Sequence, residues 1–234
     1  MVVFFVSLKV TLIWVVIRFI SLFLVMFLWW KDMNKETLLG YHTFKLEMCL
    51  RLGIMFFILS EVFFFVRFFW AFFDASLVPV VDIGIMWPPK GIITLSMYSV
   101  PLLNTILLLR SGLTVTWAHH SLLNNLYFKR LIRLVITIVL GSYFVYMQYE
   151  EYMESRFSLS DRVYGSTFFI ATGFHGFHVI LGTLFLTGST FLLYKGRILF
   201  NHHFSFEFAA WYWHFVDVVW LFLFVSIYWW GRII

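Results

Sequence analysis

Long apolar stretches follow one another along this 234-residue chain, separated by short polar segments. Each stretch is close to the roughly 20 apolar residues that a helix needs to cross the hydrocarbon core of a bilayer. The predicted helices cover residues 8–30, 47–74, 100–122, 131–152, 163–194 and 206–230. The segment 1–30 contains no turn signal, so one long or kinked helix is expected there rather than two. The pattern predicts an all-α, polytopic membrane protein of about six transmembrane helices, built as a helical bundle.

Prolines mark the boundaries around the third predicted helix. Pro79, Pro88 and Pro89 follow the second helix, and proline ends helices because it lacks a backbone N–H. Pro101 falls in the first turn of the third helix, where that missing N–H does no harm. We expect a single transmembrane domain over residues 1–234, with a first helix and basic loop over 1–45 and a five-helix bundle over 46–234.

The composition agrees with a membrane protein. Hydrophobic residues make up 62% of the chain, charged residues only 12%, and the mean hydropathy is +0.90. Soluble domains carry about twice that share of charge. The net charge of +5 comes from residues scattered over short loops, which argues against nucleic acid as a partner. With one cysteine, Cys49, the chain can form neither an internal disulfide nor a cysteine-based metal cluster.

Charges alternate between successive loops. The first, third and fifth loops are basic, and the second and fourth are acidic or mixed. The basic loops and the residues next to them contain Lys31, Lys35, Lys45, Arg51, Lys129, Arg130, Arg133, Lys195 and Arg197. The positive-inside rule places these loops on the matrix or cytoplasmic side and both termini on the opposite side.

Glu61 lies in the middle of the second predicted helix, 13 residues from Met48 and 13 from Asp74. A carboxyl group at this depth is energetically unfavourable, so by default it marks a functional site. We expect it to be neutral or to share a proton with a partner. Two interpretations remain: a structural carboxyl that is hydrogen-bonded to a neighbouring helix, or a carboxyl that handles protons or lines a lipid cleft.

Two pairs of polar residues have helical spacing within the predicted spans. His175 and His178 share one face of the fifth helix, and His214 and Asp217 share one face of the sixth. A metal or haem site could be built from such residues on facing helices. However, no Glu-x-x-His pair lies mid-span, and glycines surround the first pair, which favours close helix contact. The spacing favours structural hydrogen bonding and leaves a metal or haem site as the alternative.

The basic side of the chain carries a further set of candidates. Lys35, His42, Lys195, Arg197, His202 and His203 belong to this set. Ordinary topological charge explains them. The functional alternative is a binding site for anionic lipid headgroups between helices.

Arg67 and Arg110 do not fit their positions inside the second and third predicted helices. Each would cost several kcal/mol if it faced lipid. For Arg110, snorkelling towards the interface would help only in part. We therefore expect Arg67 to reach Asp74, two turns along the helix, or another helix.

Several long runs of sequence point to a known family. They are WWKDMNKET (29–37), SEVFFFVRFFWAFFDASLVP (60–79), VPLLNTILLLRSGLTVTWAHHSLL (100–123), EYMESRFSLSDRVYGSTFFIATGFHGFHV (151–179) and HHFSFEFAAWYWHFVDVVWLFLFVSIYWW (202–230). From Trp29 to its end, the chain closely resembles subunit III of cytochrome c oxidase, of the haem–copper oxidases. Apolar helices that match by chance would not reproduce runs of this length.

The resemblance implies a seven-helix fold in which the first two helices splay from the other five around a lipid-filled cleft. It implies no haem or copper in this chain, because these lie in subunits I and II, and phospholipid as the bound molecule. The expected partners are subunit I, subunit II and supernumerary subunits. The implied role is to stabilise subunit I, to support its proton uptake and to protect the enzyme from inactivation during turnover. The implied location is the mitochondrial inner membrane with the C-terminus on the intermembrane-space side, or alternatively a bacterial plasma membrane.

The resemblance also assigns residues. Glu61 matches the family's carbodiimide-reactive carboxyl. Positions that line the lipid cleft are matched by Trp30, Lys35, Glu36 and His42. Lys195 and Arg197 lie in the loop that supplies basic headgroup contacts. The resemblance makes His175, His178, His214 and Asp217 structural polar residues rather than metal ligands, and no residue is expected to be catalytic.

Two features depart from the family pattern. Only about one helix fits before Trp29, so the first helix of the family is expected to be missing. Arg67 and Arg162 stand where the family pattern has glycine, and Arg110 replaces a small residue. Arginine in place of glycine at a helix contact is unfavourable in both volume and charge. We hypothesise that some of these arginines result from translation with a codon table unsuited to the genome.

Two alternative functions remain. One is the equivalent subunit of a quinol oxidase, which shares the fold and would be distinguished by subunits I and II. The other is a proton-coupled transporter built around Glu61. A transporter predicts broken helices and an internal inverted repeat, and the sequence shows neither.

Overall fold

The computed structural model describes residues 2–41, 43–81, 84–198 and 203–233. Six of the described helices are long and apolar enough to cross a membrane, which confirms the predicted number. The elements are α1 (Val2–Leu38), α2 (Phe44–Leu77), α3 (Val100–Leu123), α4 (Tyr127–Glu154), α5 (Arg162–Tyr194), α6 (Phe204–Leu223), η2 (Phe224–Trp230) and α7 (Gly231–Ile233).

The predicted ranges agree with α2 to α6–η2 to within four residues at either end. The first helix was predicted too short, because α1 extends from Val2 to Leu38 instead of from 8 to 30. Its beginning is mostly apolar, and its polar end, KDMNKETL, consists mostly of residues that tolerate a helix well. Helical hydrogen bonding therefore continues past the point where hydrophobicity ends.

The chain divides into two compact units, Met1–Leu50 and Arg51–Ile234. The first unit contains α1, the following turn and the beginning of α2. Within it, the span Thr11–Met33 buries none of its most hydrophobic window against other parts of the chain. Such a helix is stabilised by its own backbone hydrogen bonds in an apolar environment.

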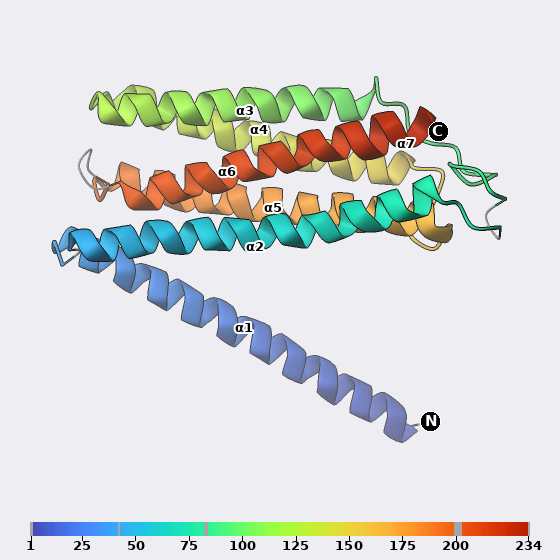
Figure 1. Cartoon of the computed structure of the whole chain (residues 1–234). Helices are drawn as coiled ribbons and strands as arrows, with labels where there is room; N and C mark the ends of the chain where they lie inside the picture. The colour runs from blue at the N-terminus through green and yellow to red at the C-terminus, as the bar shows by residue number, and fades with distance from the viewer. Residues whose placement is uncertain (1, 42, 82–83, 199–202, 234) are drawn as a thin grey trace. The chain divides into compact units, whose positions relative to one another are not determined.

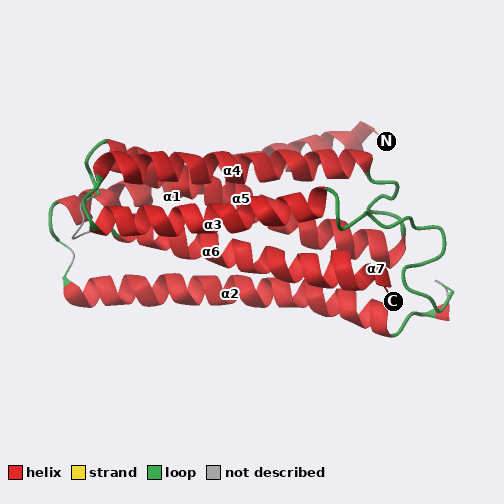
Figure 2. Ribbon diagram, turned by 90° about the horizontal axis from the view of Figure 1, so that it is seen from above, coloured by secondary structure: helices red, strands yellow, loops and turns green. Residues whose placement is uncertain are grey.

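The second unit is a helical bundle (Figure 1). Within it, α3, α4, α5 and α6 each pack against the next, and α6 returns to α3. The part of α2 from Arg51 onwards lies along α5 and α6. Its aromatic side chains make this contact, because the Phe64 ring lies 5.0 Å from Phe174 of α5 and the Phe57 ring 6.2 Å from Tyr212 of α6. Figure 2 shows only helices and connecting loops in the described part of the chain.

The bundle core is built around two tryptophans of α6. Trp213 and Trp220 are fully buried. The indole N–H of Trp213 donates to Ser111 Oγ at 2.9 Å, and that of Trp220 donates to Thr105 Oγ1 at 3.0 Å. Because the hydroxyl acceptors both belong to α3, these two bonds set the register of α6 against α3.

The connections alternate between the two ends of the bundle (Figure 2). At the end with the α3–α4 and α5–α6 connections lie Lys129, Lys195 and Arg197. At the end with the α2–α3 and α4–α5 loops and α7 lie Asp74 and Asp161. The charge alternation in the sequence therefore becomes a charge difference between the two ends.

The three unexpected arginines occupy different environments. Arg67 on α2 and Arg110 on α3 are exposed at the surface of the second unit. Neither forms an ion pair within the described part of the chain, so the expected contact of Arg67 with Asp74 is not formed. Arg162, the first residue of α5, has φ = +56°, a left-handed conformation that favours glycine.

Candidate functional site

The intramembrane carboxyl of Glu61 on α2 meets a histidine of α5. Its Oε2 atom lies 2.8 Å from Nε2 of His178. The side chain of Glu61 is 22% exposed and that of His178 is 8% exposed. The two residues are 117 positions apart in the sequence, so only the packing of α2 on α5 brings them together.

The second ring nitrogen of His178 decides where the hydrogens of this pair lie. Nδ1 is 2.6 Å from the carbonyl oxygen of Phe174, and a carbonyl oxygen can only accept. Nδ1 therefore carries a hydrogen and donates it. The bond between Nε2 and Glu61 must then be made by one shared proton, which lies either on the carboxyl or on the imidazole. In the first case both groups are neutral, and in the second they form an ion pair of zero net charge.

Aromatic rings enclose the pair. Phe65 lies 5.0 Å from the imidazole of His178, Phe64 lies 6.0 Å away, and Tyr212 stacks on it at 6.4 Å. These rings lower the local dielectric constant, which strengthens a hydrogen bond between polar partners. The arrangement can hold a proton at mid-depth in the bundle and move it between two atoms without any change in net charge.

His175 lies one turn before His178 but does not join this pair. Its Nε2 donates to the carbonyl oxygen of Val216 on α6 at 3.2 Å. Its Nδ1 has no hydrogen-bond partner among the residues described. The ring packs against Phe144 and Trp220, at 5.5 and 5.2 Å between ring centres. His175 therefore connects α5 to α6.

His214 and Asp217 of α6 face α3. Thr116 donates its hydroxyl to the carbonyl oxygen of Gly112, so Thr116 Oγ1 accepts from Nε2 of His214 at 3.3 Å. Asp217 lies against Gly112, where a Cβ would come 2.6 Å from Asp217 Oδ2. Its Oδ1 has no partner in the described part of the chain. Both residues belong to the α3–α6 interface.

The described residues contain no group of three or more histidine, cysteine, aspartate or glutamate side chains that could hold a metal ion. The predicted polar residues divide between two interfaces: His178 with α2, and the other three with the α3–α5–α6 core. Glu61 and His178 form a direct pair of titratable side chains between α2 and α5.

Comparison with known proteins decides the family. The family model described as cytochrome c oxidase subunit III matches residues 1–232. The chain belongs to the cytochrome c oxidase subunit III family. Among similar proteins, cytochrome c oxidase subunit 3 of Myxine glutinosa is 56% identical over 213 residues, which cover 91% of this chain and 82% of the relative. The same subunit of Chondrus crispus is 55% identical over 216 residues, covering 92% and 79%.

Membership of this family confirms the resemblance read from the sequence. The chain is one subunit of a multi-subunit oxidoreductase complex of the inner membrane, which it crosses several times. Cytochrome c oxidase subunit 3 of Struthio camelus is 56% identical over 213 residues, which cover 91% of this chain and 82% of the relative.

The lipid-binding residues that the family suggests lie in both units of this subunit III chain. Trp30, Lys35 and Glu36 lie on α1, where Lys35 Nζ is 3.6 Å from Asp32 Oδ1. His42 lies outside the described residues. Lys195 and Arg197 are exposed after the end of α5, and Nζ of Lys195 lies 5.5 Å from the centre of the Phe191 ring.

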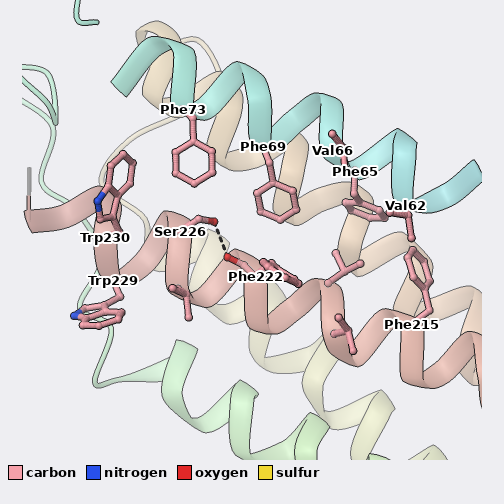
Figure 3. A pocket seen from close by; sticks show the side chains of 13 residues that line it. Val62, Phe65, Val66, Phe69, Phe73, Phe215, Phe222, Ser226, Trp229 and Trp230 are labelled. Carbon is pink, nitrogen blue, oxygen red and sulfur yellow. Dashed lines mark hydrogen bonds between the residues drawn. The ribbon is translucent and has the colours of Figure 1, made fainter. Parts of the chain in front are cut away.

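An apolar groove of about 670 Å³ runs between α2 and the α6–η2 segment of this subunit III chain (Figure 3). Phe69 and Phe73 of α2 line one side, and Phe222 and Trp230 line the other. The centres of the Phe73 and Trp230 rings lie 5.0 Å apart, and these two rings narrow one end of the groove. The hydroxyl of Ser226 also lies in the lining, but it donates to the carbonyl oxygen of Phe222 at 2.6 Å. The groove therefore offers almost only apolar contacts.

Sequence reasoning missed a buried carboxyl in α4. Glu151 was not singled out from the sequence, and it is only 2% exposed inside the helical bundle. Gln148, one turn earlier, is 4% exposed and donates to Glu151 Oε2 at 3.3 Å. The i, i+3 spacing of two polar residues that are able to hydrogen-bond was the available signal.

Proposed function

We propose that this chain is the non-redox subunit of a proton-pumping terminal oxidase that transfers electrons from cytochrome c to oxygen. In this proposal it stabilises subunit I, contacts subunit II and supernumerary subunits, and supports proton uptake into subunit I. The observation that carries the proton part is the 2.8 Å contact between Glu61 and His178. Haem and copper belong to subunits I and II in this scheme, and no side chain of this chain is assigned a catalytic role.

The proton-shared pair suits this role. A proton that arrives at Glu61 or His178 can be held by both groups, since either one can carry it in the same hydrogen bond. Aromatic rings surround the imidazole of His178, and Glu61 keeps part of its side-chain surface exposed. A group that is both enclosed and partly accessible can exchange protons slowly with a site beside it while remaining structurally fixed.

The decisive experiment is turnover of the intact oxidase with Glu61→Gln, followed over many catalytic cycles with proton pumping recorded. Glutamine keeps the size and a hydrogen bond to His178 but cannot release a proton. We expect a normal initial rate followed by early decay of activity, or a lower pumping yield. Glu154→Gln, at the exposed end of α4, is the matched control and should behave as wild type. Unchanged rate, pumping and lifetime in Glu61→Gln would make the residue a structural carboxyl.

We also propose that the subunit binds phospholipid, with an acyl chain in the groove between α2 and α6–η2. From Val62 to Phe73 the groove follows twelve residues of α2, whose eleven steps of 1.5 Å span about 16 Å. Its walls carry large side chains, whereas transmembrane helices associate through small ones, which favours a flexible chain over a partner helix. At its narrowed end, exposed Asp74 follows Phe73, and exposed Arg232 lies two residues after Trp230. A zwitterionic headgroup complements these two charges.

A groove-filling variant tests this site. Val66→Trp should reduce the phospholipid that remains bound to the purified oxidase, because the indole takes the place of the acyl chain. Val139→Trp, at an exposed position of α4 away from the groove, is the control. Equal phospholipid content in both variants and the wild type would contradict an acyl chain in the groove.

The family resemblance supports a second lipid site, which binds anionic headgroups. It comprises Trp30, Lys35, Glu36 and His42, with Lys195 and Arg197 on the same basic side. The same proposal treats residues 1–45 as a first helix with its basic loop and residues 46–234 as the five-helix bundle of one domain. Replacement of Lys195 and Arg197 by glutamine should lower retention of anionic phospholipid and leave zwitterionic phospholipid unchanged. Equal loss of both classes would contradict a headgroup-specific site.

We propose that the basic connections face the matrix and the C-terminus the intermembrane space. The charge difference between the two ends of the bundle supports this orientation. Trypsin should cleave the α5–α6 connection at Lys195 or Arg197 only in inverted inner-membrane vesicles. Cleavage in mitoplasts of normal orientation would show that the topology is the opposite of the proposed one.

A further inference from the structure

A buried polar cluster connects α4 to η2 near the end of the bundle that carries the α4–α5 loop. Glu151 and Gln148 of α4 are 2% and 4% exposed, and Tyr228 of η2 is 3% exposed. The side-chain amide of Gln148 donates to Glu151 Oε2 at 3.3 Å. The hydroxyl of Tyr228 lies near both the carboxyl and the amide but has hydrogen-bond geometry to neither. Three polar side chains from two elements thus converge inside an otherwise apolar core.

Direct contacts leave three oxygens of this cluster unsatisfied. Glu151 Oε1, Gln148 Oε1 and the hydroxyl of Tyr228 have no partner with hydrogen-bond geometry among the described residues. The hydroxyl of Tyr152 donates to Thr172 Oγ1 at 2.7 Å, because Thr172 itself donates to the carbonyl oxygen of Phe168, so Tyr152 has no hydrogen left for the oxygens of Glu151 and Gln148. Buried polar atoms in native proteins are nearly always hydrogen-bonded, since leaving one unpaired costs about 1–3 kcal/mol.

The number and kind of these oxygens match one small ligand. The oxygen of Gln148 can only accept, the oxygen of Glu151 accepts when the carboxyl is ionised, and the hydroxyl of Tyr228 can donate. A water molecule donates two hydrogens and accepts from a third group, and buried waters typically make about three such bonds. No lysine, arginine or histidine forms an ion pair with Glu151 in the described part of the chain, so a cationic side chain does not complete the cluster.

We propose that Glu151, Gln148 and Tyr228 form a binding site for one internal water molecule. The water donates to Glu151 Oε1 and to Gln148 Oε1 and accepts from the hydroxyl of Tyr228. It thereby bridges α4 and η2, which are separate elements of the subunit. The rings of Phe168 and Trp220 lie 5.4 and 5.8 Å from the Tyr228 ring and enclose this side of the site.

The position of Tyr228 in η2 supports the site. Phe224–Trp230 is wound as a π-helix, a rare form that frequently occurs at functional sites. Such a segment directs its side chains differently from a continuous α-helix. In this case it brings the Tyr228 hydroxyl to the polar residues of α4. A bridging water then holds the π-helical turn, which also borders the groove through Ser226 and Trp230.

The test is a cryo-EM map of the intact oxidase at a resolution that shows ordered waters elsewhere in the same subunit. We expect a water density within hydrogen-bond distance of all three oxygens in the wild type. The Glu154→Gln control should keep it, because Glu154 is exposed at the end of α4. Tyr228→Phe should lose the density or displace it towards α4, because the donor to the water is removed.

Two results would overturn the proposal. The first is a wild-type map with no density there and with the Tyr228 hydroxyl bonded directly to Glu151. The second is a density at about 2.3–2.6 Å from the oxygens, which indicates a bound cation instead of water. The wild-type map decides between these outcomes even if a variant fails to assemble.

Discussion

The indole ring of Trp213 on α6 lies directly against Gly141 of α4. A Cβ at Gly141 would come 2.5 Å from Cη2 of this ring and 2.7 Å from Cγ2 of Thr183 on α5. On its other side the ring meets Gly182 of α5, where a Cβ would come 2.9 Å from Cε3. Three helices therefore meet around one tryptophan because two of them carry no side chain at the contact. A methyl group added at Gly141 or Gly182 would therefore meet rigid neighbours, with neither a flexible side-chain end nor open space to accommodate it.

Gly141→Ala is expected to destabilise the subunit in the oxidase by about 1–3 kcal/mol, the usual range for overpacking a close-packed core. Gly188→Ala is the matched control, since nothing lies within 4 Å of a Cβ there and alanine favours the helix. The midpoint temperature at which the subunit dissociates from the purified complex measures both. A midpoint for Gly141→Ala equal to or above that of Gly188→Ala would contradict this account of the core.

The Glu61–His178 bond predicts energetic coupling. Glu61→Leu and His178→Leu should each destabilise the subunit, because each leaves one buried polar group unpaired. The double variant should lose less stability than the two single variants together, with a coupling free energy of roughly 0.5–3 kcal/mol. The midpoint of thermal dissociation of the subunit from the complex again serves as the measurement. Glu61→Leu combined with His214→Leu is the control pair, because His214 bonds to Thr116 instead. Additive effects for Glu61 and His178 would show that their contact contributes nothing.

The backbone of Arg162 predicts a stabilising substitution. At φ = +56° a residue with a Cβ is strained by roughly 1–2 kcal/mol, and glycine is not. Arg162→Gly should therefore raise the thermal midpoint of the subunit. Arg156→Gly in the same loop, where φ is not positive, should leave it unchanged or lower it. A fall for Arg162→Gly would mean that the guanidinium makes a contact in the complex that outweighs the strain.

The hypothesis of translation with an unsuitable codon table rests on Arg67 and Arg162. The resemblance predicts glycine at both positions. Arg67 is exposed mid-span without an ion pair in the described chain, and Arg162 has a glycine-like backbone. We expect mass spectrometry of the corresponding peptides from the isolated protein to show a smaller residue at one or both positions. Arginine at both would refute this, and a carboxylate on another subunit would then be sought opposite Arg67.

The hydrophobic pattern alone determined the number of membrane helices, their approximate ends and the alternation of charge between loops. These properties depend on local composition, because every backbone group inside a bilayer must be hydrogen-bonded within its own helix. The same pattern singled out Glu61, since a carboxyl in mid-span is conspicuous in any apolar stretch. The sequence also indicated the family, through long runs such as HHFSFEFAAWYWHFVDVVWLFLFVSIYWW.

The tertiary structure alone decided which of these residues meet. Lipid chains are as apolar as leucine, so hydrophobicity does not distinguish a helix face that contacts lipid from one that contacts another helix. His175 and His178 are equivalent by spacing, yet the packing of α2 on α5 pairs only His178 with Glu61. Glu151 looks like a loop charge, yet it is buried inside the bundle. Contacts of this kind depend on helix rotation and register, which small residues such as Gly141 and Gly182 set through the close approach that they permit.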